Sequence, residues 1–174
     1  MKNPSSFGGF FCTFHRAKKL PMKEKDRIIK LFKELYNGDP WLDSSISGNL
    51  SNIDAEWAAQ KPRHVTNSIW EIVNHLSIWR EVVLDRINGA EADTPDHNYF
   101  LPIADKSEKA WSISLRKLEK SQEDWLGFLD KLTDEKLSQR YLETHYTVYD
   151  LIFGIMQHDA YHLGQLALLK NYEL

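Results

Sequence analysis

Hydrophobic residues recur at helical spacing over four stretches of this chain, residues 23–36, 67–88, 108–131 and 148–170. Within each stretch the apolar side chains lie three or four positions apart, which places them on one face of an α-helix. The first stretch ends at Asn37-Gly38-Asp39-Pro40, where glycine can cap a helix and proline cannot continue one. Thr66 and Asn67 are both suitable N-caps for the second stretch. The pattern therefore predicts an all-α protein in which four helices form a bundle.

The connections between the predicted helices are long. Residues 37–65 are rich in serine, asparagine and glycine and include one short helical pattern near residues 53–57. Connections of this length do not require an up-down-up-down order with tight turns. With 174 residues and no internal repeat, the chain is long enough for a single domain with a sizeable core. We therefore expect one four-helix bundle with long connections.

The inward faces can be read from the spacing. In the first stretch the apolar positions are Ile28, Leu31, Phe32 and Leu35. In the third stretch the face consists of Trp111, Leu115, Leu118, Gln122, Trp125, Leu129 and Leu132. In the fourth stretch it consists of Leu151, Ile155, His158, His162, Gln165 and Leu169. The last two faces contain polar residues where a bundle would bury apolar ones best.

Two histidines on the fourth predicted helix are candidate metal ligands. His158 and His162 are four residues apart, so both rings lie on one face of the helix. A polar group in a core is destabilising unless it has a partner, and one metal ion would bind both rings at once. The alternative is that each ring is an ordinary core histidine held by a hydrogen bond.

His75 is the candidate third ligand. It lies on the apolar face of the second predicted helix, three residues after Ile72 and four before Trp79. One histidine from this helix and a pair from another can bind a divalent ion on three sides and leave a fourth position open, as in catalytic zinc sites. Trp79 itself is expected in the core rather than on a substrate surface.

Three further polar residues have more than one interpretation. Asp159 can act as a general base, fix a ligand ring by a hydrogen bond, or lie at the solvated edge of the helix, and the two structural roles are favoured. Gln165 can support a ligand or pack between helices. Gln122 can face the histidines, although partial exposure is the simpler interpretation. His145, just before the fourth helix, is expected in a solvated loop.

Composition and charge exclude several classes of protein. No apolar run approaches the roughly 18 residues of a transmembrane helix. Cys12 is the single cysteine, which excludes an internal disulfide and is typical of a reducing, cytoplasmic compartment. Residues 1–21 contain four basic and no acidic residues, so the remaining 22 − 4 = 18 basic residues face 25 acidic ones. An acidic body offers no electrostatic surface for nucleic acid.

The first 21 residues do not continue the helical pattern. Either Met22 is the natural start of the protein or residues 1–21 are a dispensable extension, with a transit-like leader as a third alternative. The predicted domain therefore covers residues 22–174.

The sequence His158-Asp159-x-x-His162-Leu163-Gly164-Gln165 resembles the signature of the DinB/YfiT-like family, in which it follows an apolar run. The segment 69–76, which ends in His75-Leu76, is similar to the other conserved block of that family. The resemblance covers roughly residues 23–170. It implies a four-helix bundle with a three-histidine divalent metal site, formed here by His75, His158 and His162, and often a homodimer. Tyr149 and Phe153 are candidates for such an interface.

The resemblance limits the reaction less than it limits the site. Characterised relatives include bacillithiol and mycothiol S-transferases and a mycothiol-dependent maleylpyruvate isomerase. An ion held by three neutral imidazoles activates either a thiol, for transfer to an electrophile, or water, for hydrolysis. We therefore expect a thiol transferase acting on a small-molecule substrate, with a metal-dependent hydrolase or a non-catalytic metal-binding, stress-response bundle as alternatives. Zinc or nickel is the expected metal, and manganese or iron would also suit the site.

Overall fold

A computed structural model describes residues 22–91 and 93–172. Within these residues it contains seven α-helices and no strand longer than an isolated bridge between Arg140 and Thr147. The helices are α1 (Glu24–Asn37), α2 (Ile46–Leu50), α3 (Ala55–Ala59), α4 (Ile69–Ile87), α5 (Glu108–Asp130), α6 (Asp134–Ser138) and α7 (Val148–Lys170). The prediction of an all-α bundle is confirmed. Residues 1–21, the predicted extension before Met22, lie outside the described residues.

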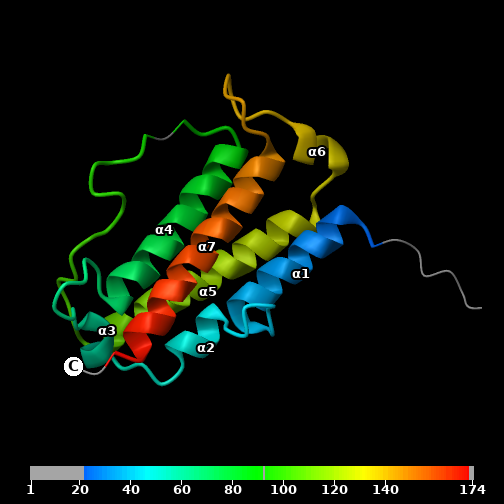
Figure 1. Cartoon of the computed structure of the whole chain (residues 1–174). Helices are drawn as coiled ribbons and strands as arrows, with labels where there is room; N and C mark the ends of the chain where they lie inside the picture. Colours follow the sequence, from blue (N-terminus) through cyan, green and yellow to red (C-terminus); the bar gives the residue numbers. More distant parts are fainter. Residues whose placement is uncertain (1–21, 92, 173–174) are drawn as a thin grey trace, which may run out of the picture.

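The four long helices form the bundle, with α4 between α5 and α7, and α1 on the opposite side (Figure 1). The helices α4 and α5 run in the same direction, while α1 and α7 run against them. The connection between α4 and α5 therefore returns along the whole length of the bundle, beside α4. This order confirms that the long connections do not make an up-down-up-down bundle.

The helix starts agree with the capping chemistry of the sequence, with one correction. Ser107 caps α5 and Thr147 caps α7, each through its side-chain oxygen. The cap of α4 is Ser68, not Thr66 or Asn67. Its side chain accepts from the amide of Glu71, and the Glu71 carboxylate accepts from the Ser68 amide in return. This reciprocal capping box satisfies two amides that would otherwise be unpaired, which explains why Ser68 is preferred over its neighbours.

The predicted inward faces are correct for most positions, and the deviations follow from helix rotation. Ile28, Phe32 and Leu35 of α1 are buried, but Leu31 is 44% exposed. In α7 the buried positions are Val148, Ile152, Ile155, Met156, Asp159, His162, Leu163, Leu166 and Leu169. The face is thus turned by about one residue from the expected seam, so that Asp159 replaces His158 at the centre of the bundle.

The core consists of two apolar clusters separated by a polar layer. One cluster lies near α2 and α3 and includes Trp70 and Trp111, and the other lies near α6 and includes Phe32 and Trp125. The polar layer is formed by the buried residues His75, Arg80, Gln122, Asp159 and His162. It lies between the two clusters, where α4, α5 and α7 each place polar side chains in the interior, and it contains the candidate site. None of the described helices is long and apolar enough to cross a lipid bilayer.

Candidate metal centre

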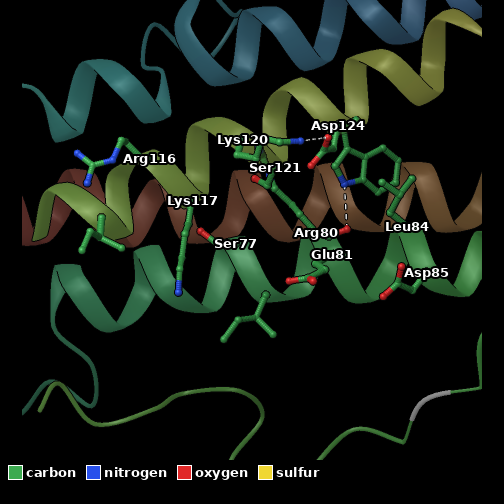
Figure 2. A pocket seen from close by; sticks show the side chains of 13 residues that line it. Ser77, Arg80, Glu81, Leu84, Asp85, Arg116, Lys117, Lys120, Ser121 and Asp124 are labelled. Atoms are coloured by element: carbon green, nitrogen blue, oxygen red, sulfur yellow. Dashed lines mark hydrogen bonds and ion pairs between the residues drawn. The ribbon is translucent and has the colours of Figure 1, made fainter. Parts of the chain in front are cut away.

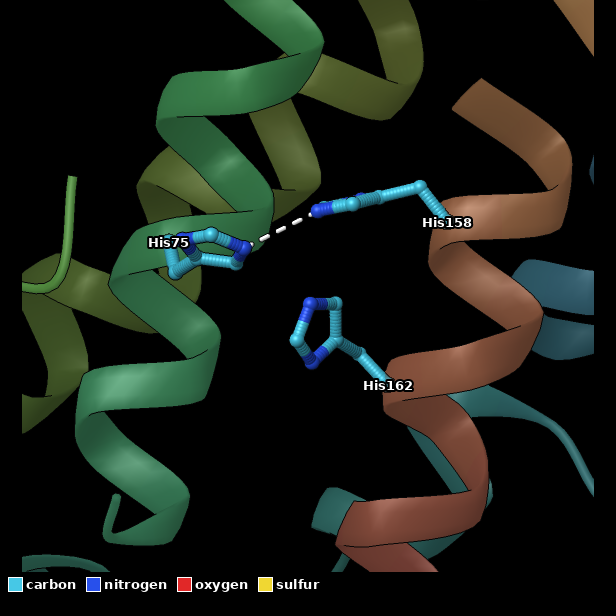
Figure 3. A group of neighbouring side chains, drawn as sticks. All are labelled: His75, His158 and His162. Carbon is cyan, nitrogen blue, oxygen red and sulfur yellow. Dashed lines mark hydrogen bonds between the residues drawn. The ribbon is translucent and has the colours of Figure 1, made fainter. Parts of the chain in front are cut away.

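The fold brings His75, His158 and His162 together at the polar layer (Figure 3). His75 comes from α4, and the other two come from successive turns of α7. One ring nitrogen of each residue lies within 4.8 Å of the other two, and the Nε2 atoms of His75 and His158 are 2.9 Å apart. Among the described residues, these three form the group of side chains that could hold a metal ion.

Hydrogen bonds fix the tautomer of two of the rings. The Nδ1 of His75 donates to the carbonyl oxygen of Asn98 at 2.8 Å, and the Nδ1 of His162 donates to Oε1 of Gln165 at 2.7 Å. Because each Nδ1 carries the proton, each Nε2 has a free lone pair. Two lone pairs thus face the centre of the cluster. This is the arrangement in which histidine binds a metal, with the second ring nitrogen held by another residue.

The third ring, His158, is not satisfied by protein atoms alone. Within the described chain, His158 Nδ1 and Asp159 Oδ1 are buried without hydrogen-bond partners, 3.6 Å apart. Since His75 Nε2 is an acceptor, a neutral His158 that donates to it leaves a bare Nδ1 facing the carboxylate. A metal ion at Nε2 would move the proton to Nδ1, where Asp159 can accept it. A second proton on His158 would also give Asp159 a hydrogen-bond donor, but only a metal ion would bind His162 as well. The donor set therefore fits a divalent cation.

Burial keeps the rings in the neutral form that a metal requires. Desolvation, together with the neighbouring His162 and His158 rings, lowers the pKa of His75 from 6.5 to about 3. The same two causes, burial and the adjacent His158, lower the pKa of His162. A neutral imidazole is the ligand form, so the site is prepared for a cation well below neutral pH.

These shifts predict that the metal-free protein loses stability in mild acid. Between the ordinary pKa of 6.5 and the folded value of about 3 for His75, the unfolded chain binds a proton that the folded ring does not. Stability therefore falls as pH falls, by up to about 1.4 kcal/mol per pH unit for each such ring. Urea unfolding of chelator-treated protein between about pH 7 and pH 5 measures this slope. A slope that is unchanged in His75→Phe would contradict the assignment, and His145→Ala serves as the unaffected control.

A buried ion pair holds Asp159 in place. The carboxylate is fully buried and its Oδ2 accepts from Nε and Nη2 of Arg80, at 2.9 and 2.8 Å. The Nη1 of Arg80 donates to Oε1 of Gln122 at 3.0 Å, and Gln122 donates to the carbonyl of Phe32. One guanidinium thus joins α4, α5 and α7, and Gln122 extends the network to α1. Burial and pairing of Asp159 favour the positioning role over that of a general base, because no atom of it reaches solvent.

The long α4–α5 connection covers His75. Phe100 stacks on its ring with centroids 3.8 Å apart, and the Asn98 side chain accepts from Trp79 Nε1 at 3.2 Å. Asn98 and Tyr99 have φ values of +47° and +60°, a conformation that is uncommon for a tyrosine. The edge-to-face contact between Tyr99 and Trp79 stabilises this turn. The connection therefore presents the Asn98 carbonyl to His75.

The sequence profile of the DinB superfamily matches residues 46–166, which are 166 − 45 = 121 of the 174 residues. The chain belongs to the DinB superfamily. The match contains all three histidines and begins at α2, so α1 lies outside it. A search of curated proteins and a search of solved structures each found no match.

One side of the three-histidine cluster opens into a cavity. His75 is 1% and His162 5% exposed, whereas the side chain of His158 is 23% exposed. His158 lines a cavity of about 540 Å³ between α4, α7 and the segment before α7. Trp79 lines the same cavity and is partly buried, and it also packs against the apolar cluster near α6, so it lies at the edge of the core. A ligand can reach the cluster from this side.

A second, larger hollow of about 630 Å³ lies on the other side of α4, against α5 (Figure 2). Its charged lining residues are Arg80, Glu81, Asp85, Arg116, Lys117, Lys120 and Asp124. Lys120 pairs with Asp124, and none of the three histidines lines this hollow. This hollow is therefore not an entrance to the three-histidine cluster.

The other residues that the sequence singled out agree only in part with the expectations for them. Gln122 is buried and does not face the histidines, because it binds Arg80 instead. His145 is exposed, as expected, and its ring contacts Tyr146. Gln165 does contact a candidate ligand. Phe153, a candidate for a homodimer interface, lines the cavity, and the interface itself stays a prediction.

Sequence analysis missed Arg80 and Asn98. Arg80 had a usable signal, because it interrupts the apolar series Leu76, Val83 and Ile87 at spacings of four, three and four. A buried arginine on such a face needs a buried acid, and Asp159 is the acid on the facing helix. Asn98 acts on His75 through its backbone carbonyl, which no side-chain pattern can indicate.

Proposed function

We propose that this DinB-superfamily protein is a metal-dependent enzyme that transfers a low-molecular-weight thiol to an electrophilic substrate. The observation that supports this most is the open side of the three-histidine cluster, where His158 faces the α4–α7 cavity. A metal site that serves only stability is usually closed by four protein ligands, whereas catalytic sites have three and an open position. Among the described residues no fourth ligand joins the cluster.

The protein residues supply the geometry of the centre. Three neutral imidazoles leave the charge of a bound divalent ion uncompensated, so a thiol or water in the open position would lose its proton readily. His75 and His162 would bind through Nε2, with their rings held by Asn98 and Gln165. Asp159 would accept a hydrogen bond from Nδ1–H of His158, and the pair with Arg80 holds Asp159 in place.

Two observations favour thiol transfer over hydrolysis. The cavity wall is largely apolar, so it fits an apolar electrophile and offers few polar groups to position an attacking water. Asp159, the acid next to the cluster, is fully buried and paired, so it is not placed to take a proton from an attacking water. In the transfer step the thiol releases its proton to solvent, its sulfur bonds to the electrophilic carbon, and the leaving group departs with the bonding electrons.

A direct spectrophotometric assay tests this proposal. Zinc- or nickel-loaded protein is incubated with chlorodinitrobenzene and, in turn, cysteine, glutathione, coenzyme A, bacillithiol or mycothiol, and thioether formation is followed by absorbance. We expect acceleration with at least one thiol, and loss of at least about 100-fold in His158→Ala and after chelation. His145→Ala is the matched control, since its ring lies in the exposed segment before α7. No acceleration with any thiol by metal-loaded protein would refute thiol transfer.

A further inference from the structure

The cavity between α4 and α7 has the composition of a binding site for an apolar group. Its wall includes the apolar side chains Trp79, Val83, Leu151, Phe153 and Ile155. Its volume of about 540 Å³ lies within the range of about 300–1,000 Å³ for small-molecule sites. Aromatic side chains on both helices can stack against a flat ring. Since His158 lies at its inner end, a molecule in the cavity would be next to the candidate metal position.

The charges around the cavity disfavour an anion. Asp150 is the one carboxylate on the wall, and no lysine or arginine is among the lining residues. Its Oδ2 accepts from the amide and the hydroxyl of Thr147, which lowers its pKa and keeps it ionised. Arg86 lies over the Trp79 ring at 5.4 Å from its centroid and is not among the lining residues. At the Asp150 end of the cavity, away from the candidate metal position, an anionic group would therefore meet a negative charge and no lysine or arginine of the wall.

A glycine creates part of the space. Gly154 lies on α7 one turn before His158 and lines the cavity. A Cβ atom added at this position would have no neighbour within 4 Å. Glycine in the middle of a helix is unfavourable, so a larger residue here would favour the helix and reduce the cavity.

From these observations we infer that the α4–α7 cavity binds the electrophilic substrate through an apolar, in particular aromatic, group, and that Asp150 disfavours a negative charge at its end of the cavity. This inference rests on the proposed function, and it adds the substrate class and the residue, Gly154, that sets the size of the site. Trp79 and Phe153 provide the apolar contact surface, and Asp150 provides the discrimination against negative charge.

Binding of two matched probes tests the inference without any reaction. Naphthalenemethanol and naphthalenesulfonate share one ring system and differ in charge. Their affinities for the full chain are measured by calorimetry after chelation, so that a bound metal ion does not attract the sulfonate. We expect the neutral probe to bind about tenfold more tightly or better, given one like charge at short range. Equal or tighter binding of the sulfonate would overturn the selectivity, and no saturable binding of the neutral probe would overturn the site.

A variant pair locates the probe. Gly154→Leu is expected to weaken binding of the neutral probe at least about tenfold while the melting temperature stays equal or rises. Gly127→Leu is the matched control, because Gly127 is also an exposed helical glycine with an open Cβ position, on α5 and outside the cavity. Unchanged binding in Gly154→Leu would overturn the inference. Metal content and thiol transfer are measured on the same preparations before chelation, so failure of the proposed reaction is distinguished from failure of the cavity.

Discussion

Replacing His162 with alanine is expected to abolish stoichiometric metal binding while the bundle stays helical. His162 would supply one of three ligands, its ring is 5% exposed, and Gln165 orients its Nε2 toward the other two rings. Loss of a residue that only supports a ligand typically lowers metal affinity about 10–100-fold, so loss of the ligand itself should exceed about 100-fold. Competition with a chromophoric chelator measures the affinity, and circular dichroism measures the helix content.

Graded variants make this prediction sharper. Gln165→Ala should fall in the range of about 10–100-fold, because it removes the acceptor for His162 Nδ1 and leaves the ligand in place. His145→Ala should have no effect, since its ring contacts Tyr146 and not the cluster. If His162→Ala and His158→Ala retain the affinity of the unaltered chain, these rings are core histidines and do not bind metal.

Replacing Arg80 with leucine is expected to have the largest effect on stability. Arg80 is 1% exposed and pairs with Asp159, which is fully buried, so the variant leaves a carboxylate without a partner inside the bundle. Removal of one member of a buried ion pair destabilises a protein by about 3–5 kcal/mol. Gln122 also loses its donor. The free energy of unfolding in urea measures the change.

The double variant Arg80→Leu, Asp159→Leu separates ion pairing from packing. It removes both charges, so it should recover most of the stability that Arg80→Leu loses. Lys61→Ala, which breaks an exposed pair with Glu71, should change stability by less than about 1 kcal/mol. A stability loss in Arg80→Leu no larger than in Lys61→Ala would contradict the central place of this pair in the polar layer.

The fold and the three-histidine cluster could be predicted from the sequence because both depend on periodicity. Spacings of three and four positions defined the four long helices, and they also placed His158 and His162 on one face. The short helices α2 and α6 were not predicted, because five residues do not complete two turns of a hydrophobic pattern. Their caps, Ser45 and Thr133, were visible only as ordinary loop residues.

The surroundings of the site could be predicted less well from the sequence, because they depend on how the helices are rotated. A turn of about one residue in α7 moved Asp159 from a possible solvated edge to the centre of the bundle. The same packing placed Trp79 at the edge of the core, where it also forms part of a cavity wall. The contact of Asn98 with His75 depends on the path of a long connection with two residues at positive φ. Periodicity carries no information about such a path.

Metal content of the unaltered, untagged chain is the decisive measurement for the three-histidine site. Elemental analysis after reconstitution with zinc, nickel or manganese should find about one divalent ion per chain, as expected for one three-histidine site. The same analysis of His75→Ala should find none, because His75 is the residue of the cluster that α4 contributes. Absence of metal from the unaltered chain after all three reconstitutions, or equal metal in His75→Ala, would contradict the three-histidine centre.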